Sequence, residues 1–290
     1  IRYTSQKKNR YGENRLRADG LLEYPCRTLA SLFSPAIFYG EKLSSIRKII
    51  KQNIQEEFAR NSLIRTIPQQ GRNNARLVLT LMKILDGKPV ENLTGLYVPS
   101  NALDVMTDIA IASPAVCAYR QSGNEEDAQM VAKAVVSVFN KPESAAVIDL
   151  MYNKKNDDNY YESVLDYCAI GNLQAVLDEY LYMAPENKKL GQVVTDAIIG
   201  TSNLSIDTTD SLGKEEKKQL MRCHFAIPFI DKTVTDKSVT RTTNIRKAFN
   251  SPFRPFLLST TSIGQEGLDF HWYARKIVHW NLPSNPVDLE

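Results

Sequence analysis

Apolar residues in the first half of the chain recur at every third or fourth position, which is the spacing of one face of an α-helix. One such stripe covers residues 43–58, and a second covers residues 77–85. Gly87 follows the second stripe in the position that a helix-terminating glycine prefers. Two further helices are predicted to begin at the candidate N-caps Ser100 and Asn124.

This helical region is predicted to extend over residues 41–153, without a repeat of fixed length. It should end in the polar run 153–159, which has no apolar residue and predicts a domain boundary. Beyond that run, apolar stripes around residues 164–181 indicate more helix, and the alternation at Leu204 and Ile206 is typical of an edge strand.

Residues 1–40 are predicted to form a basic arm or linker. The first 20 residues carry six Lys or Arg against two Asp or Glu, with tyrosines between them. Such an arm could follow a phosphate backbone, which would make its binding strongly salt dependent, or it could be a solvated linker. The net charge of +3 does not decide between these alternatives, because it is ordinary for a globular surface.

The last forty residues have a different pattern. The apolar run 256–258 gives way to hydroxyl residues, to Gly264 and Gly267, and then to Asp269. A second strand-like run follows at residues 276–280. Strand, polar glycine loop and strand are the order found in α/β sheets, whose ligands bind at the carboxyl ends of the strands.

The segment from Thr261 to Asp269 resembles the fifth conserved motif of superfamily-two helicases and translocases, in the form of RapA-like and chromatin-remodeller-like motors. In those families a Thr-x-x-x-x-x-Gly-x-Asp/Asn loop lies between the nucleic-acid backbone and the ATP site. The run 277–286, with its Leu-Pro-x-Asn-Pro ending, resembles the next strand of the family. The segment that begins at Arg241 resembles the arginine-led helix that precedes the fifth motif in the family. The resemblance thus covers residues 220–290.

The resemblance implies that residues 154–290 form most of a second RecA-like lobe, an α/β domain with a parallel sheet, incomplete at its C-terminal end. The helical region before it would then be an insertion between the two motor lobes. The family's functional residues match positions of this chain in three groups: nucleic-acid contacts at Thr260, Thr261 and Gly264; nucleotide contacts at Gly267 and Asp269; and coupling of the two sites at Gln265, Glu266 and Arg241, with no direct contact assigned to Glu266.

The sequence contains no Gly-x-x-x-x-Gly-Lys-Ser/Thr phosphate-binding loop. ATP and Mg²⁺ are therefore expected to bind mainly to a first RecA-like lobe, which would be a partner of this chain together with nucleic acid, duplex DNA being the favoured track. An arginine-containing sixth motif is expected to begin after Glu290. We expect the chain to be a piece of a longer ATP-dependent helicase or translocase, and to be inactive alone.

Other chemistry is weakly supported by the sequence. No apolar run approaches the roughly 20 residues that span a bilayer, so a cytoplasmic location without membrane contact is predicted. The spacing of the histidines matches no metal-ligand signature. The acidic pair Asp178 and Glu179 imitates a magnesium-binding pair, but it continues a helical stripe and is predicted to face water. Four separated cysteines are predicted to be reduced and mostly buried: Cys26, Cys117, Cys168 and Cys223.

One alternative function belongs to another class. A degenerate RecA-like lobe and the helical region could form a scaffold that binds nucleic acid or protein without turnover. A small-molecule enzyme has no supporting constellation, since no Gly-x-Ser-x-Gly sequence surrounds the hydroxyl residues 259–262. A phosphate-binding loop and an arginine motif elsewhere in the polypeptide would favour the motor over the scaffold.

Overall fold

The computed structural model describes residues 20–34, 40–91, 93–152, 160–183, 189–198, 202–206, 219–223, 247–253, 272–276 and 278. The chain divides into two compact units, Ile1–Val193 and Val194–Glu290. The first unit is mainly helical and contains a small parallel sheet.

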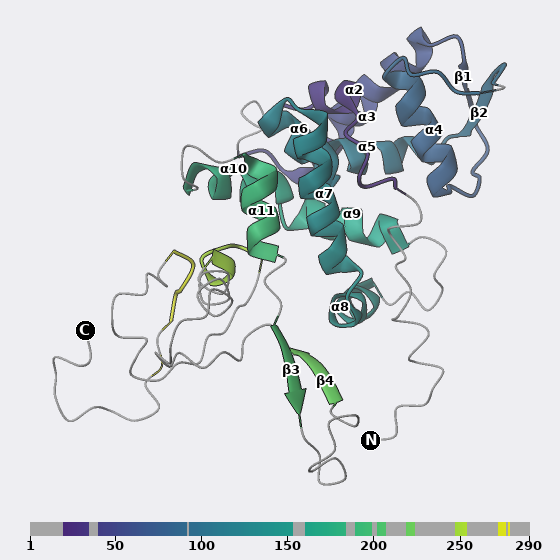
Figure 1. Ribbon diagram of the computed structural model, residues 1–290. Coiled ribbons are helices and arrows are strands. Elements are labelled where there is room, and N and C mark those ends of the chain that lie inside the picture. The colour runs from purple at the N-terminus through teal and green to yellow at the C-terminus, as the bar shows by residue number, and fades with distance from the viewer. Residues whose placement is uncertain are drawn as a thin grey trace, which may run out of the picture. The chain divides into compact units, whose positions relative to one another are not determined.

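The elements of the first unit follow one another as a helical array with one pair of strands (Figure 1). Its helices are α2 (Arg27–Ser31), α3 (Leu43–Arg60), α4 (Ala75–Leu85), α5 (Ala102–Ala112), α6 (Pro114–Ser122), α7 (Glu125–Phe139), α8 (Pro142–Tyr152), α9 (Tyr160–Ile170) and α10 (Leu173–Met183). Its strands are β1 (Ile64–Ile67) and β2 (Leu96–Pro99). Helix α11 (Leu190–Ile198) crosses the division between the two units.

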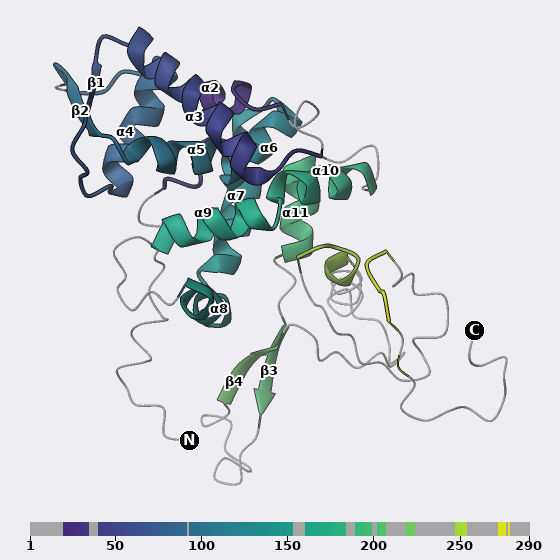
Figure 2. The ribbon, with the colours of Figure 1, turned by 180° about the vertical axis from the view of Figure 1, so that it is seen from behind.

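The two strands are parallel, with Ile64 opposite Leu96 and Ile67 opposite Pro99. They lie at one end of the unit, beside α4 in both views (Figures 1 and 2). The sequence analysis predicted helices through this region, and the helices are confirmed. The strands were not predicted, because each has only four residues and neither shows a full apolar and polar alternation.

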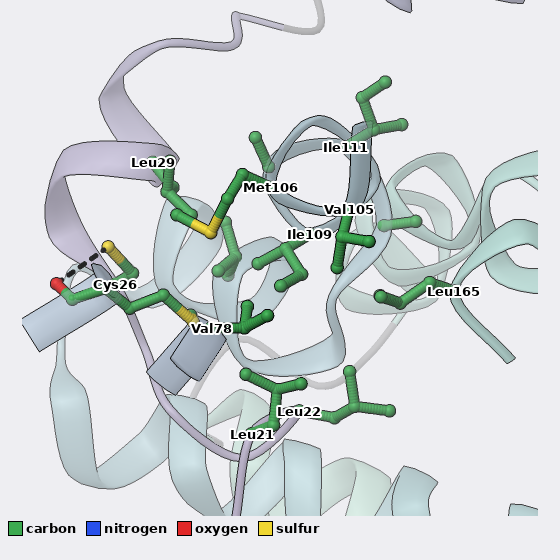
Figure 3. Packing of buried hydrophobic residues seen from close by; sticks show 14 of the residues in the cluster. Leu21, Leu22, Cys26, Leu29, Val78, Val105, Met106, Ile109, Ile111 and Leu165 are labelled. Carbon is green, nitrogen blue, oxygen red and sulfur yellow. Dashed lines mark hydrogen bonds between the residues drawn. The ribbon is translucent and has the colours of Figure 1, made fainter. Parts of the chain in front are cut away.

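Helix α5 is the centre of the core. Nine of its 11 residues are buried, and it contacts α2, α3, α4, α6 and α9. Figure 3 shows side chains from several elements around Met106 and Ile109 of α5, among them Leu29 from α2, Val78 from α4 and Leu165 from α9. Because α5 is covered on almost every side, it is apolar nearly all round its axis, as expected of a buried helix.

Residues 20–34 belong to this core and do not form an arm or linker. Leu21, Leu22, Cys26 and Leu29 are all at most 1% exposed. The segment is fixed by Asp86, the C-cap residue of α4, whose carboxylate accepts hydrogen bonds from the backbone N–H groups of residues 27 and 28 at 3.2 and 2.9 Å. The arm was predicted from charge, and the charged residues lie at positions 1–19, outside the described residues.

The predicted helix ends are confirmed at two positions and wrong at a third. Asn124 accepts a hydrogen bond from the backbone N–H of Asp127 at 2.9 Å, as an N-cap should. Gly87 follows α4 with φ of +66°. Ser100 is not a cap, because its hydroxyl donates to the carbonyl of Pro68 at 3.2 Å and α5 begins one residue later than predicted.

The first unit continues past the polar run that predicted a domain boundary. Residues 153–159 lie outside the described residues, but α9 follows them and contacts α5 and α8. Val164 and Leu165 are buried, and Leu165 joins the same core as α5. The apolar face of α9 covers α5, so α9 belongs to the first unit, and the division between the units falls at residue 193.

The second unit contains β3 (Ser202–Ile206) and β4 (Gln219–Cys223), which pair in antiparallel orientation. The strand predicted at Leu204 and Ile206 is thus confirmed, and its partner is β4. Further along this unit, residues 247–249 are helical. The parallel sheet predicted for this part of the chain is not represented by the described strands, whose only pairing is antiparallel.

No single helix in the described ranges is long and apolar enough to cross a membrane. Helices α5 and α6 reach that length and composition only as a pair, and they are bent by 44° at the break between them. Both are largely buried in the helical unit.

Candidate functional site

The residues that the sequence analysis matched to a motor all lie outside the described residues. They are Arg241, Thr260, Thr261, Gly264, Gln265, Glu266, Gly267 and Asp269. Their roles at a nucleotide or a nucleic acid therefore stay predictions. Residues 247–249 are helical, within the stretch where a helix is expected before the fifth motif, and the residues 241–246 that precede them lie outside the described residues.

The strand predicted at residues 276–280 is not formed at the positions that the structure describes. Residues 274–276 and Val278 have no regular secondary structure, and Val278 is 72% exposed. A strand of this kind needs neighbours on both sides in the sheet, and no described residue pairs with these positions.

A group of charged residues lies where α3, α5 and α9 meet. Arg47 of α3 donates from Nε to Asp108 of α5 at 2.9 Å and from Nη2 to Asp166 of α9 at 2.5 Å. Tyr152, at the end of α8, donates to the other oxygen of Asp166 at 2.9 Å. One guanidinium thus connects three helices that are distant in sequence, and we call this group the Arg47 cluster.

The Arg47 cluster is partly shielded from water, which shifts its protonation equilibria. Burial lowers the pKa of Arg47, but its hydrogen bonds and ion pairs with Asp166 and Asp108 outweigh that effect, so the pKa is raised. Burial raises the pKa of Asp108, and the nearby Arg47 offsets this only in part. Burial also raises the pKa of Tyr152, and the hydrogen bond to Asp166 adds to the shift.

Two adjoining cavities flank the Asp104 and Asp108 side of α5. The larger, of about 470 Å³, faces α3 and is lined by Ser44, Arg47, Lys48, Lys51, Asp104, Thr107, Asp108 and Asp166. The smaller, of about 280 Å³, faces the loop before α4 and is lined by Gly71, Arg72, Asn73, Asn101, Asp104, Val105, Asp108, Glu162 and Leu165. Asp104 and Asp108 line both cavities.

Two cations of α3 that line the larger cavity are paired with carboxylates of α5. Lys51 donates from Nζ to Oδ1 of Asp104 at 2.5 Å, and Arg47 donates to Oδ1 of Asp108. Lys48 is exposed at the rim of the larger cavity. The larger cavity therefore holds equal numbers of cationic and anionic side chains and has little net charge.

The smaller cavity is bounded by a loop that Asn101 fixes in place. The Asn101 side chain accepts from the backbone N–H of Gly71 at 3.2 Å and donates to the Gly71 carbonyl at 3.0 Å. Two residues further, Asn73 is only 4% exposed, and its Oδ1 is buried without a hydrogen-bond partner. An unpaired buried polar atom of this kind costs about 1–3 kcal/mol, so Asn73 is an unusual residue to find at a cavity wall without a partner.

Sequence reasoning missed this site. The available signal was the placement of Asp104 and Asp108 four residues apart in a helix that is otherwise apolar, with Arg47 among the stripe residues of an earlier helix. A half-buried charge in an apolar stripe needs a partner, so Arg47 and Asp108 could have been predicted to meet.

Of the acidic pair Asp178 and Glu179, which imitates a magnesium-binding pair, only Asp178 has a structural role. Asp178 is half-buried and accepts hydrogen bonds from Gln121 and from Gln174, the latter at 2.7 Å. The prediction that both carboxylates face water is wrong for Asp178 and confirmed for the exposed Glu179. Gln174 also accepts from the half-buried Arg120 at 2.8 Å, so α10 is attached to α6 through this network.

Arg120 itself joins three elements. It donates to the backbone carbonyls of Ala30 and Ala110, and its guanidinium lies 4.7 Å from the ring centroid of Phe33. Burial lowers the pKa of Arg120. Since its donors are used by the protein, we assign Arg120 to the stability of the fold.

Among the described residues, no group of three or more His, Cys, Asp or Glu is placed to hold a metal ion. Cys26, Cys117 and Cys168 are free and buried, as the sequence predicted. Comparisons of the chain with protein-family models, with curated proteins and with solved structures found no match.

Proposed function

We propose that this chain is part of an ATP-dependent nucleic-acid translocase and contributes much of its second RecA-like lobe. The observation that carries the proposal is the order of residues from Thr261 to Asp269: a hydroxyl residue, a glycine six positions later and a carboxylate two positions after that, between apolar runs. A cytoplasmic location and duplex DNA as the track belong to the same proposal.

The residue types suit the proposed roles. Thr261 offers a neutral hydroxyl donor to a phosphate oxygen, a contact that positions a protein on nucleic acid without reading its sequence. Gly264 and Gly267 let the backbone approach phosphate and ribose where a Cβ would intervene. Asp269 would accept a hydrogen bond from the nucleotide ribose. A loop that touches both ligands can then convert closure of the two lobes into a step along the track.

The helical unit fits the proposal as an insertion between motor lobes. It has its own core of buried residues around α5, as expected of a domain inserted into another. The phosphate-binding loop, Mg²⁺ and most contacts with ATP would come from the first lobe, as the absence of a Gly-x-x-x-x-Gly-Lys-Ser/Thr sequence in this chain requires.

The test is ATP hydrolysis by the full-length protein, measured with duplex DNA, single-stranded DNA and RNA, at low and moderate salt. Strong stimulation by one nucleic acid is expected, and that nucleic acid is the track. Thr261→Ala should lose most of the stimulation and keep nucleotide binding, whereas the neighbouring Ser259→Ala is the matched control and should behave as wild type. Absence of hydrolysis under every condition would refute the motor.

A second candidate is a scaffold that binds a partner without turnover. The observation that favours it is the pair of cavities beside the Arg47 cluster, which lie in the helical unit and far in sequence from the fifth-motif residues. Retained binding of nucleic acid by a protein without ATPase activity would support this alternative.

A further inference from the structure

The strand pair β1 and β2 has one face toward the core and one toward solvent. Ile64 and Val98 are buried on the core side. Arg65 lies opposite Tyr97 in the parallel register, and both are exposed, Tyr97 at 61%. Because paired residues of neighbouring strands share a face, Arg65 and Tyr97 stand together on the outer side. A large aromatic ring that is mostly exposed adds little to the core, so it is open to a ligand.

The loop after β1 covers the other end of this outer face. The carbonyl of Gln69 accepts from the backbone N–H of Ser100 at 3.2 Å, and a Cβ on Gly71 would lie 3.0 Å from Cβ of Pro99. Side chains two positions apart in a strand point to the same face, so Pro99 and Tyr97 share it. The loop therefore packs over Pro99, which is buried, and leaves Tyr97 exposed beside it.

The segment that forms β1, this loop and α4 is basic. Residues 58–85 carry five Lys or Arg and no Asp or Glu, although the whole chain is nearly balanced at 36 against 33. Arg72 of the loop lines the smaller cavity beside carboxylates and has a partner, so its charge is already in use. Arg65 donates only to the Tyr97 hydroxyl, at 3.5 Å, and the exposed Arg76 in the first turn of α4 pairs with no described carboxylate. Both guanidinium groups therefore keep their charge for a ligand.

We infer that the outer face of β1 and β2, continued by the loop and the start of α4, binds a single strand of nucleic acid. Arg65 and Arg76 contact phosphates, and an unpaired base stacks on the ring of Tyr97. The Arg65 guanidinium carbon, 6.0 Å from the centroid of that ring, places a phosphate contact next to the stacked base. A base inside a duplex is already stacked on its neighbours, so the exposed ring favours a single strand. Binding here needs no ATP and does not depend on the proposed motor activity.

The test is fluorescence anisotropy of a labelled oligothymidylate of about 20 nucleotides, longer than one small domain covers, titrated without ATP with the full-length protein at several salt concentrations. Tyr97→Ala should weaken binding by about tenfold and leave its salt dependence unchanged, because it removes stacking and no charge. Tyr97→Phe keeps the ring and should bind as wild type. Arg65→Gln and Arg76→Gln should each lower the slope of log Kd against log salt by about 0.7, the value for one phosphate of a single strand. Lys133→Gln on α7, which removes one exposed cation elsewhere, is the matched control and should change neither quantity.

Melting curves establish that each variant is folded, which is expected because the substituted side chains are exposed. Wild-type affinity of Tyr97→Ala would overturn the inference, as would a matching duplex that binds as tightly and is weakened as much by Tyr97→Ala. Displacement of the oligonucleotide by polyglutamate as readily as by unlabelled oligothymidylate would show an acidic-peptide surface and overturn it too.

The same titrations in a Thr261→Ala background separate this surface from the fifth-motif contacts. The losses caused by Tyr97→Ala and Arg76→Gln should persist there, and their disappearance would contradict the inference. Absence of ATP hydrolysis with these losses intact would refute the motor and leave the surface on β1 and β2 standing.

Discussion

Replacement of Arg47 by methionine should destabilise the helical unit, because it leaves two carboxylates without their cation. Methionine keeps most of the aliphatic stem and its contacts, so the change isolates the guanidinium. The side chains of Arg47, Asp108 and Asp166 are 35%, 24% and 30% exposed, which places the Arg47 cluster between surface and buried ion pairs.

The expected magnitude follows from that exposure. Surface pairs contribute up to about 1 kcal/mol, whereas removal of one partner from a buried pair costs about 3–5 kcal/mol. Two contacts of intermediate exposure therefore indicate a loss of about 2 kcal/mol in the free energy of unfolding. For a unit of this size the melting temperature should fall by about 4–8 °C.

The assay is thermal and urea unfolding followed by circular dichroism, with wild type and Arg47→Met compared at pH 7. The triple variant Arg47→Met, Asp108→Asn, Asp166→Asn should regain most of the lost stability, because it removes the stranded charges as well. This account of the Arg47 cluster would be refuted if the Arg47→Met protein had the same melting temperature as the wild type. It would also be refuted if the triple variant were no more stable than the single one.

Three further outcomes are expected. Gly191→Ala should lower stability by about 1–3 kcal/mol in urea unfolding, because the new Cβ would lie 2.6 Å from Oδ1 of Asp127, which accepts from the Gly191 N–H. Burial raises the pKa of Cys117 to about 11, so iodoacetamide should label its peptide at pH 8 only after unfolding, as mass spectrometry can show; rapid labelling of folded protein would contradict this. The folded pKa of Asp108 is raised above its ordinary 3.8, so its stabilising contribution is complete below that value and is lost as pH rises through the folded pKa. Wild type should therefore gain stability relative to Asp108→Asn on going from pH 7 to pH 4, and an unchanged difference would show that Asp108 does not titrate abnormally.

The helices of the first unit were predictable because apolar residues three and four positions apart identify one face of each helix from the local sequence alone. The stripe at residues 77–85 and the glycine after it specify both the existence and the end of α4. Ile49 shows the limit of this reasoning, since it shares the apolar character of its neighbours in α3 and is nevertheless 44% exposed. Which part of a broad stripe is buried depends on the helices that pack against it.

Features that depend on distant parts of the chain could not be predicted from local pattern. The short strands β1 and β2 form only because each is the partner of the other, about thirty residues apart. The polar run 153–159 indicated a domain end, yet local polarity identifies a surface loop and cannot tell whether the next helix returns to the same core. The cavity residues were missed for the same reason, since Asn73, Asp104 and Glu162 are ordinary until the fold brings them together.

The connection of α3, α5 and α9 through one guanidinium also sets the smallest fragment that should fold. Arg47 and Asp166 are separated by 119 positions, so their contact forms only after most of the helical unit has been synthesised. A protein cut within the polar run 153–159 would lose α9, expose one side of α5 and leave Arg47 with a single carboxylate. Dissection of this protein should therefore begin from a piece that extends from residue 20 past α9 to the end of the first unit at residue 193.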